Sequence, residues 1–316
     1  MSTACLICLI IFGLIMFFGI LPTFIMSYFL YRELFVRKNP NERVRHCSFP
    51  DDEEYVKMYS EGLDWGKENE SAKEAVEIES EGAHLFGEYF DFGFKKAVII
   101  IPGRTEDCTY SYYFSEPYKK AGCNVLCIDN RAHGLSDGTC HNLGATEYKD
   151  ILKWSQLLHD KYGNETVILH GICIGAQVAM KLMTNEICPS YIKAMVTEGM
   201  FTTFRDSFDE HMREGHHPIF PFTLWVMLWI RIRSHANVLT EGPVKWIGSL
   251  DKPILMLHSR QDKYSTPKQG EILNNLCKAP KKMVWFDEGE HSRIRPRNTE
   301  AFDKEIEEFV KNLAID

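Results

Sequence analysis

The feature that most constrains this chain is an uncharged apolar segment at its start. No Asp, Glu, Lys or Arg occurs between Met1 and Tyr31, and nearly every residue from Ala4 onward in this stretch is apolar. A helix over this stretch rises about 1.5 Å per residue and spans roughly 42 Å, more than the ~30 Å hydrocarbon core of a bilayer. A cleaved signal peptide needs a basic leading segment and a shorter apolar run, and the sequence has neither. We therefore predict a retained transmembrane helix over residues 1–31.

Basic residues directly after the apolar segment predict its orientation. They are Arg32, Arg37, Lys38, Arg43 and Arg45, and no basic side chain precedes the segment. The positive-inside rule then places the rest of the chain in the cytoplasm, in a single-pass topology with a short N-terminus outside. The 10 cysteines lack the spacing of a disulfide framework, which agrees with a reducing compartment.

The overall composition excludes two classes of protein. The hydrophobic fraction of 45% is ample for a buried core, so the chain is not intrinsically disordered. Asp and Glu (44) outnumber Lys and Arg (36), which argues against a strongly basic nucleic-acid-binding protein. We expect a membrane and a small molecule as partners, and no nucleic acid.

Beyond the apolar segment, the chain divides into a linker and one domain. Residues 32–74 are polar and acidic and are predicted to be a stalk. From residue 75 to residue 316, short apolar runs alternate with longer amphipathic segments, which is typical of a parallel sheet covered on both faces by helices. After a hairpin over 75–80 and 84–92, we predict strands over 97–101, 124–129, 166–170, 191–197, 253–258 and 282–286, and helices over 109–121, 145–162, 175–183, 267–276 and 300–313.

Residues 200–248 interrupt this alternation. They carry eight Phe and Trp side chains and four histidines, and the run over 220–232 is too short to cross a bilayer. We predict a mostly helical cap whose apolar face covers a pocket or contacts lipid headgroups.

The segment from Gly171 to Gly175 carries the strongest chemical signal. Its sequence is Gly-Ile-Cys-Ile-Gly, and it joins a predicted strand to a predicted helix. A sharp turn of this kind needs glycines because side chains at 171 and 175 would collide with neighbouring backbone. The turn presents Cys173 above the sheet edge at a helix N-terminus, which favours a thiolate and an oxyanion.

These motifs resemble those of the α/β-hydrolase superfamily, from about residue 75 to the end of the chain. The segment over 100–104 resembles the oxyanion loop, with Pro102 in place of the usual His, and 129–136 resembles the family's Asp-x-Arg-Gly-x-Gly-x-Ser loop, with Ala132 in place of Gly. The pattern is similar to the serine-aminopeptidase and monoacylglycerol-lipase-like branch. Cys at the nucleophile position departs from most members but is shared with dienelactone-hydrolase-like proteins.

The resemblance implies a catalytic triad in the order nucleophile, acid, histidine. Asp262 follows the strand predicted at 253–258 and His291 follows the one at 282–286, so both lie at the sheet edge that carries Cys173. Glu198, which ends the strand at 191–197, is the alternative acid. The backbone N–H groups of Ile174 and Arg104 are the expected oxyanion-hole donors.

We therefore expect a membrane-anchored hydrolase with a Cys173–His291–Asp262 triad that cleaves an ester, thioester or related acyl bond. The aromatic cap and the anchor suggest an apolar, lipid-derived acyl group. No metal and no organic cofactor are implied. Acyl transfer and peptidase activity use the same triad and remain alternatives, as does a membrane-tethered binding module with a relic of the triad.

Overall fold

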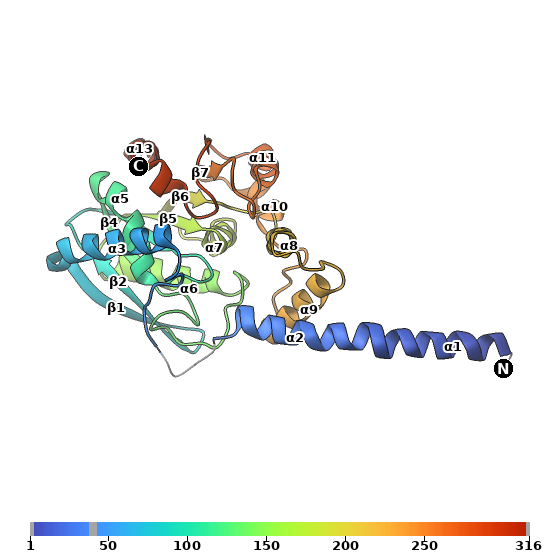
Figure 1. The fold of residues 1–316 in the computed structure, drawn as a ribbon. Helices are drawn as coiled ribbons and strands as arrows, with labels where there is room; N and C mark the ends of the chain where they lie inside the picture. The colour runs from blue at the N-terminus through green and yellow to red at the C-terminus, as the bar shows by residue number, and fades with distance from the viewer. Residues whose placement is uncertain (1–2, 38–42, 314–316) are drawn as a thin grey trace.

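The computed structural model describes residues 3–37 and 43–313, so Lys38, used above for orientation, lies outside the described residues. Its centre is an eight-stranded sheet in the order β1-β2-β4-β3-β5-β6-β7-β8 (Figure 1). Strand β2 runs antiparallel to β1 and β4, and the other neighbouring pairs are parallel. The strands are β1 Lys73–Ser80, β2 Ala83–Phe90, β3 Lys96–Ile101, β4 Cys123–Ile128, β5 Thr166–Ile172, β6 Ile192–Glu198, β7 Ile254–Ser259 and β8 Lys281–Phe286.

Both faces of the sheet are buried because its central strands carry mostly apolar side chains on both faces, as in residues 97–101 of β3. In β3, Val98 and Ile100 belong to one hydrophobic cluster, whereas Ala97 and Ile99 belong to the cluster on the opposite face. Helices α6 Glu147–Asp160, α7 Ile174–Met183 and α11 Pro267–Leu276 contribute to the second cluster, and α3 Glu53–Glu68, α5 Glu116–Lys120 and α13 Thr299–Lys311 contribute to the first. The prediction of a mostly parallel sheet covered on both faces by helices is confirmed.

The helix predicted over 109–121 is broken into three short pieces. These are α4 Cys108–Ser111, the 3₁₀ turn Tyr112–Phe114 and α5 Glu116–Lys120. Pro117 lies in the first turn of α5. Because proline lacks a backbone N–H and its ring excludes the carbonyl four residues earlier, one continuous helix cannot pass through this position.

The N-terminal segment forms one long helix made of α1 Thr3–Ile15, a π-helical turn over Met16–Ile20 and α2 Leu21–Phe35. The π turn lies directly before Pro22, whose missing N–H disturbs the regular hydrogen-bond ladder. Within the described residues this is the one helix long and apolar enough to cross a membrane, and its apolar window is not buried against the domain. The helix is therefore compatible with a single-pass anchor.

The helix continues beyond the predicted boundary at Tyr31 because its last turn packs against the domain. Tyr31 and Phe35 are buried in a cluster with aromatic side chains of the cap. Arg37 donates to the carbonyl oxygens of Gly134 and Ser136, and Val36 forms a β-bridge with Cys140. The apolar segment is thus joined to the domain by many contacts and not by a free linker.

The segment predicted to be a stalk differs most from the expectation. Helix α3 buries Tyr55, Met58 and Trp65 in the core cluster on one face of the sheet, and the Trp65 indole N–H donates to Glu116 (2.8 Å). These apolar residues recur at helical spacing and form one stripe, whereas the acidic residues cover the remaining surface of the helix. The overall polarity of the segment concealed this pattern.

The cap consists of α8 Phe204–Glu214, α9 Phe222–Ser234 and the short α10 Pro243–Trp246, as expected for a mostly helical insertion. Helix α9 lies beside α2 (Figure 1). The ring of Trp229 stacks on Phe24 at a centroid separation of 4.6 Å, and its indole N–H donates to the Ser27 hydroxyl (3.1 Å). The cap therefore rests on the C-terminal half of the long N-terminal helix.

Candidate active site

The candidate nucleophile Cys173 lies in a strained turn between β5 and α7. Its backbone has φ 53° and ψ −113°, and its N–H donates to the Glu198 carbonyl (2.9 Å). A residue with a side chain rarely adopts positive φ, and residues that do so concentrate at functional sites. The strain holds the Cys173 thiol at the start of α7, where backbone N–H groups point toward it.

The flanking glycines are required by close backbone contacts. A Cβ atom at Gly171 would lie 2.4 Å from the backbone of Ala176, and one at Gly175 would lie 2.1 Å from the Ile101 carbonyl oxygen. Neither contact can be relieved by moving a flexible side chain. Gly175 therefore lets the turn pack directly against the end of β3, from which the candidate oxyanion loop leaves.

The structure brings the other two predicted triad residues to this turn. Asp262 follows β7 and His291 follows β8, and the His291 Nδ1 lies 2.7 Å from Asp262 Oδ2. The second Asp262 oxygen accepts the backbone N–H groups of Tyr264 (2.8 Å) and Ser265 (2.7 Å). The carboxylate is thus fixed by three donors and orients the imidazole.

The electrostatics of this group favour a charged pair. Burial by itself would raise the pKa of Asp262, but His291 and the two backbone donors outweigh burial and hold that pKa below its usual value. Burial would lower the pKa of His291, but Asp262 and Cys173 raise it well above its usual value. The buried His291 Nε2 has no hydrogen-bond partner in the described parts of the chain. This nitrogen is available to exchange a proton with the Cys173 thiol.

The two predicted oxyanion donors face the same space. Ile174 is the first residue of α7 and Arg104 lies in the loop after β3, and both line a cavity of about 340 Å³ with Cys173 and His291. No acceptor for either backbone N–H occurs within residues 3–37 and 43–313. These two N–H groups are therefore available to act as the predicted oxyanion donors in the cavity that contains Cys173.

Glu198, the alternative acid, does not pair with His291. Its carboxyl group is completely buried at the end of β6 and accepts only the Ile294 N–H (3.3 Å) through one oxygen. Its other oxygen has no partner in the described residues, and burial raises the pKa of Glu198 to about 7. Asp262 is therefore the acid that contacts His291, and Glu198 contacts the backbone of the loop that follows His291.

The pKa of Glu198 predicts a pH-dependent stability. The folded protein keeps the Glu198 proton up to about pH 7, whereas the unfolded chain releases it near the usual pKa of 4.5. Stability should therefore fall as pH rises through this window, by up to about 3 kcal/mol. In Glu198→Gln this contribution is absent, so its melting temperature in detergent should fall less between pH 5 and pH 7.5. Substitution of the exposed Glu77 by Gln is the control; equal pH slopes in all three proteins would contradict the assignment.

Several residues at the site were missed by the sequence reasoning. Phe49, from the segment predicted to be a stalk, lines the cavity beside the triad. From the cap, the His211 ring stacks on Tyr264 at 3.7 Å, and Tyr264 packs edge-on against His291. Burial lowers the pKa of His211 to about 4, so its ring is neutral at pH 7. In the sequence, the position of Tyr264 two residues after Asp262 was the signal that could have placed this ring at the site.

Other candidate groups have structural roles. Arg131 forms an ion pair with Asp150, and the two ring nitrogens of His133 face the carbonyl oxygens of Arg131 and Arg104. All 10 cysteines are free thiols, and burial raises the pKa of Cys123 to about 12. The described ranges contain no group of three or more His, Cys, Asp or Glu side chains arranged to hold a metal ion.

Comparison with known proteins agrees with this architecture. Residues 96–227 match the family model described as the alpha/beta hydrolase fold. The uncharacterized protein YqkD of Bacillus subtilis is 26% identical over 218 residues, which cover 68% of this chain and 71% of that protein. A solved esterase from Pyrococcus furiosus superposes with a TM-score of 0.66 at 22% identity, covering 78% of this chain and 94% of the esterase.

A second solved esterase, from Exiguobacterium antarcticum, has a TM-score of 0.58 at 17% identity and covers 75% of this chain and 99% of its own. The protein thus has the α/β-hydrolase fold, and the resemblance to the α/β-hydrolase superfamily is confirmed.

Proposed function

We propose that this protein is a membrane-anchored hydrolase that cleaves an ester, thioester or related acyl bond with Cys173 as the nucleophile. The observation that carries the proposal is the arrangement of His291. One of its ring nitrogens lies against Asp262, and the other is buried without a partner in the described chain beside the Cys173 thiol. This is the arrangement by which an imidazole activates a nucleophile.

In the first half of the proposed reaction, the Cys173 sulfur attacks the acyl carbonyl carbon, and the proton of the Cys173 thiol resides on His291. The negative oxygen of the tetrahedral intermediate accepts the N–H groups of Ile174 and Arg104, each worth about 3 kcal/mol of barrier. The intermediate collapses when the bond to the leaving alcohol or thiol breaks. His291 donates its proton to that leaving group, and a Cys173 thioester remains.

In the second half, water attacks the thioester carbonyl and transfers a proton to His291. The same two N–H groups hold the second oxyanion. The carbon–sulfur bond then breaks, the free acid leaves, and the proton on His291 is again paired with the Cys173 sulfur. Asp262 stabilises the positive imidazole in both halves and does not itself take the proton.

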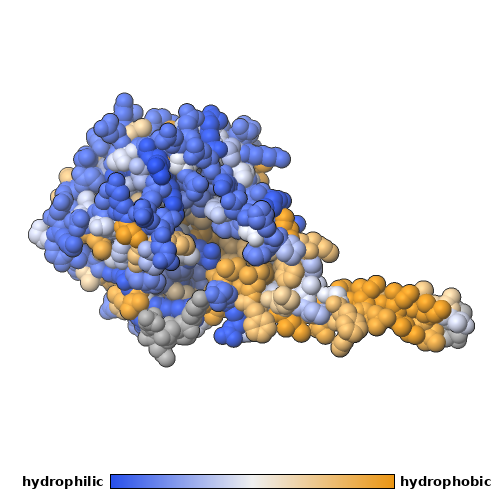
Figure 2. Space-filling model, in the orientation of Figure 1, coloured by the Kyte–Doolittle hydropathy of each residue, from blue (hydrophilic) through white to orange (hydrophobic). Residues whose placement is uncertain are grey.

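Membrane anchoring is supported by the length and exposure of the N-terminal helix. Its 33 residues correspond to roughly 50 Å of helix, and the exposed side chains before Phe24 are apolar (Figure 2). About 20 residues cross the hydrocarbon core, which puts one membrane boundary near Phe24 and Tyr28, where Trp225 and Trp229 of the cap pack. Aromatic side chains favour this boundary, so the cap lies close to the lipid.

An apolar acyl group fits the cap side of the cavity. Phe201 and Phe204 line it together with Ile174, and all three belong to the hydrophobic cluster that includes the end of the N-terminal helix. We propose that the acyl chain lies against these side chains and derives from lipid. The basic residues after the apolar segment favour a cytoplasmic position for the hydrolase domain.

The decisive experiment traps the acyl-enzyme. The full-length protein in uncharged detergent is mixed with acyl thioesters of increasing chain length, quenched in acid and mapped by mass spectrometry. We expect the acyl group on Cys173, released by neutral hydroxylamine, and no acyl group on this peptide in Cys173→Ala. Cys188→Ala, which removes another partly exposed thiol, should remain acylated. Equal turnover of wild type and Cys173→Ala would eliminate the proposed role.

Anchoring is tested separately from chemistry. Cells that express the full chain are lysed, and the membranes are washed with alkaline carbonate. A spanning helix keeps the protein in the pellet, whereas a cleaved signal or a peripheral association releases it or shortens its N-terminus. Intact mass of the pelleted protein distinguishes these outcomes.

A further inference from the structure

Two cavities meet at Arg104. The first is the catalytic cavity described above. The second, of about 320 Å³, begins at the last turn of α2 and shares Phe49, Arg104 and Thr105 with the catalytic cavity. A molecule that reaches Cys173 with its carbonyl group can therefore extend past Arg104 into the second cavity.

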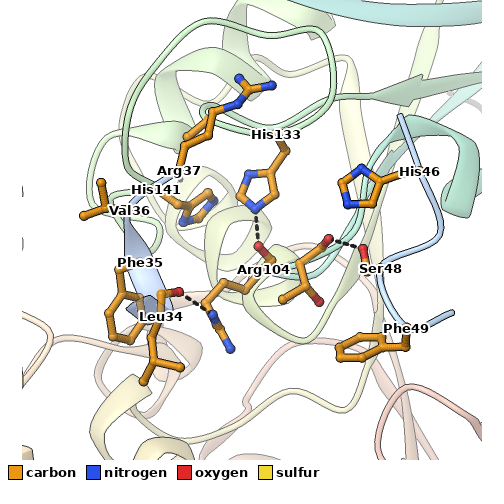
Figure 3. Close-up of a pocket in the computed structure, with 12 residues that line it drawn as sticks. Leu34, Phe35, Val36, Arg37, His46, Ser48, Phe49, Arg104, His133 and His141 are labelled. Carbon is orange, nitrogen blue, oxygen red and sulfur yellow. Dashed lines mark hydrogen bonds between the residues drawn. The ribbon is translucent and has the colours of Figure 1, made fainter. Parts of the chain in front are cut away.

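The second cavity carries positive charge from two arginines, whereas burial lowers the pKa of His133 to about 4 and that of His141 to about 3, so these two rings are neutral at pH 7. Two guanidinium side chains and three imidazoles line it together with the Ser48 and Thr105 hydroxyl groups; they belong to Arg37, Arg104, His46, His133 and His141. The lining residues within the described chain include no Asp and no Glu. Figure 3 shows the Arg104 side chain between Leu34 and Phe35 on one side and Phe49 on the other. A space lined in this way attracts an anion.

Arg104 differs from other partly buried arginines because it has no carboxylate partner within the described residues. Its guanidinium donates to the Leu34 carbonyl (2.7 Å) and lies over the Phe35 ring. Arg131 and Arg295, by contrast, form ion pairs with carboxylates. Burial opposes the charge of all three guanidinium groups. It lowers the pKa of Arg104, whereas the paired carboxylates outweigh burial and raise the pKa values of Arg131 and Arg295.

Glu106 attracts the charge of Arg104, but the two side chains form no ion pair among the described residues. Glu106 is buried in the catalytic cavity, and its carboxyl oxygens accept from the Thr105 hydroxyl (3.0 Å) and backbone N–H (3.3 Å). Burial raises the pKa of Glu106, whereas the Thr105 hydroxyl and the charge of Arg104 act in the opposite direction. The guanidinium of Arg104 thus retains unshared N–H donors between the two cavities.

We propose that the side chain of Arg104 binds an anionic group, a phosphate or a carboxylate, on the leaving-group side of the acyl substrate. The proposal rests on the proposed function for the orientation of that substrate: the acyl group lies against the cap phenylalanines, and the leaving group extends into the basic cavity. A guanidinium presents its N–H donors in a plane that matches the oxygens of both anions. The substrate class is therefore an acyl ester or thioester whose alcohol or thiol carries a negative charge.

Two small alkylating reagents of similar size test this site without any substrate. Iodoacetate is anionic and iodoacetamide is neutral, and both react with the Cys173 thiol. In the full-length protein in uncharged detergent at low salt, we expect the rate ratio of iodoacetate to iodoacetamide at Cys173 to exceed that of glutathione by about 5-fold or more. In Arg104→Gln the ratio should fall to the glutathione value, and Arg104→Lys should retain part of it.

Phe35→Leu controls for the contact of Arg104 with the N-terminal helix. This variant removes the ring under the guanidinium and keeps the charge, so both rates should change together and the ratio should persist. A wild-type ratio equal to that of glutathione, or an unchanged ratio in Arg104→Gln, would overturn the anion site. Alkylation needs no turnover, so a failed acyl-trapping experiment with a high ratio would reject the proposed function and leave the anion site standing.

Protection of Cys173 from iodoacetamide then identifies the source of the anion. A single-chain glycerophosphate lipid and inorganic phosphate are compared in wild type and Arg104→Gln. Protection by the lipid alone that is lost in Arg104→Gln indicates a lipid headgroup, and protection by both indicates a soluble phosphate compound. A matched neutral monoacylglycerol that protects as well as the phosphorylated lipid in both proteins would contradict the proposal.

Discussion

Replacing His291 with alanine should slow the formation of acyl-Cys173 by about 10⁴-fold. The buried Nε2 of this residue lies beside the thiol, and Asp262 holds its ring in position. The rate is measured by acid quench and mass mapping of the Cys173 peptide over time.

His84→Ala is the matched control, since this exposed histidine lies on the hairpin at the sheet edge, in β2. It should acylate at the wild-type rate. Acylation of His291→Ala within tenfold of wild type would show that another group activates the thiol. Asp262→Asn should retain the fold and also form acyl-Cys173 more slowly than wild type, because the imidazole is left without its charged partner.

Replacing Gly175 with alanine should destabilise the fold more than any surface substitution, by about 3–5 kcal/mol. The added methyl group would lie 2.1 Å from the Ile101 carbonyl oxygen, and no side chain can move to relieve this contact. The turn would have to shift away from β3, so the oxyanion loop would lose its position. A fall of about 10 °C in the melting temperature is the expected result.

Gly248→Ala provides the comparison. This exposed glycine has an ordinary contact distance of 3.7 Å to its nearest neighbour, so alanine fits there. A small change in melting temperature for Gly248→Ala and a large one for Gly175→Ala would show that the effect comes from the elbow. Equal stability of Gly175→Ala and wild type would mean that the turn does not pack as described.

The order of strands and helices could be predicted because each element has a local pattern of apolar and polar residues. The central strands are mostly apolar on both faces, as in residues 97–101 of β3, and the candidate nucleophile turn requires glycines on both sides of Cys173. The positions of Asp262 and His291 followed from where their strands end. These features depend on near neighbours in the sequence, so a single chain reveals them.

What could not be predicted depends on contacts between distant segments. The apolar stripe of α3 is interleaved with acidic residues, so composition suggested a linker although the helix packs on the sheet. Sequence order favours Asp262 over Glu198 as the acid beside His291, but it does not decide between them. The decision needs the orientation of the His291 ring, which contacts Asp262. The docking of α2 on the cap joins residues some 200 positions apart, and no local pattern signals such a contact.

The segment between the long N-terminal helix and β1 contacts the candidate active site. Asp52 and Glu54 form ion pairs with Arg293, two residues after His291, and Phe49 forms part of the catalytic wall. A shortened chain that begins at Lys73 would lack these contacts. The loop that carries His291 would lose its ion pairs, and one side of the cavity that contains Cys173 would be open to solvent. Removing only the exposed apolar residues before Phe24 spares both features.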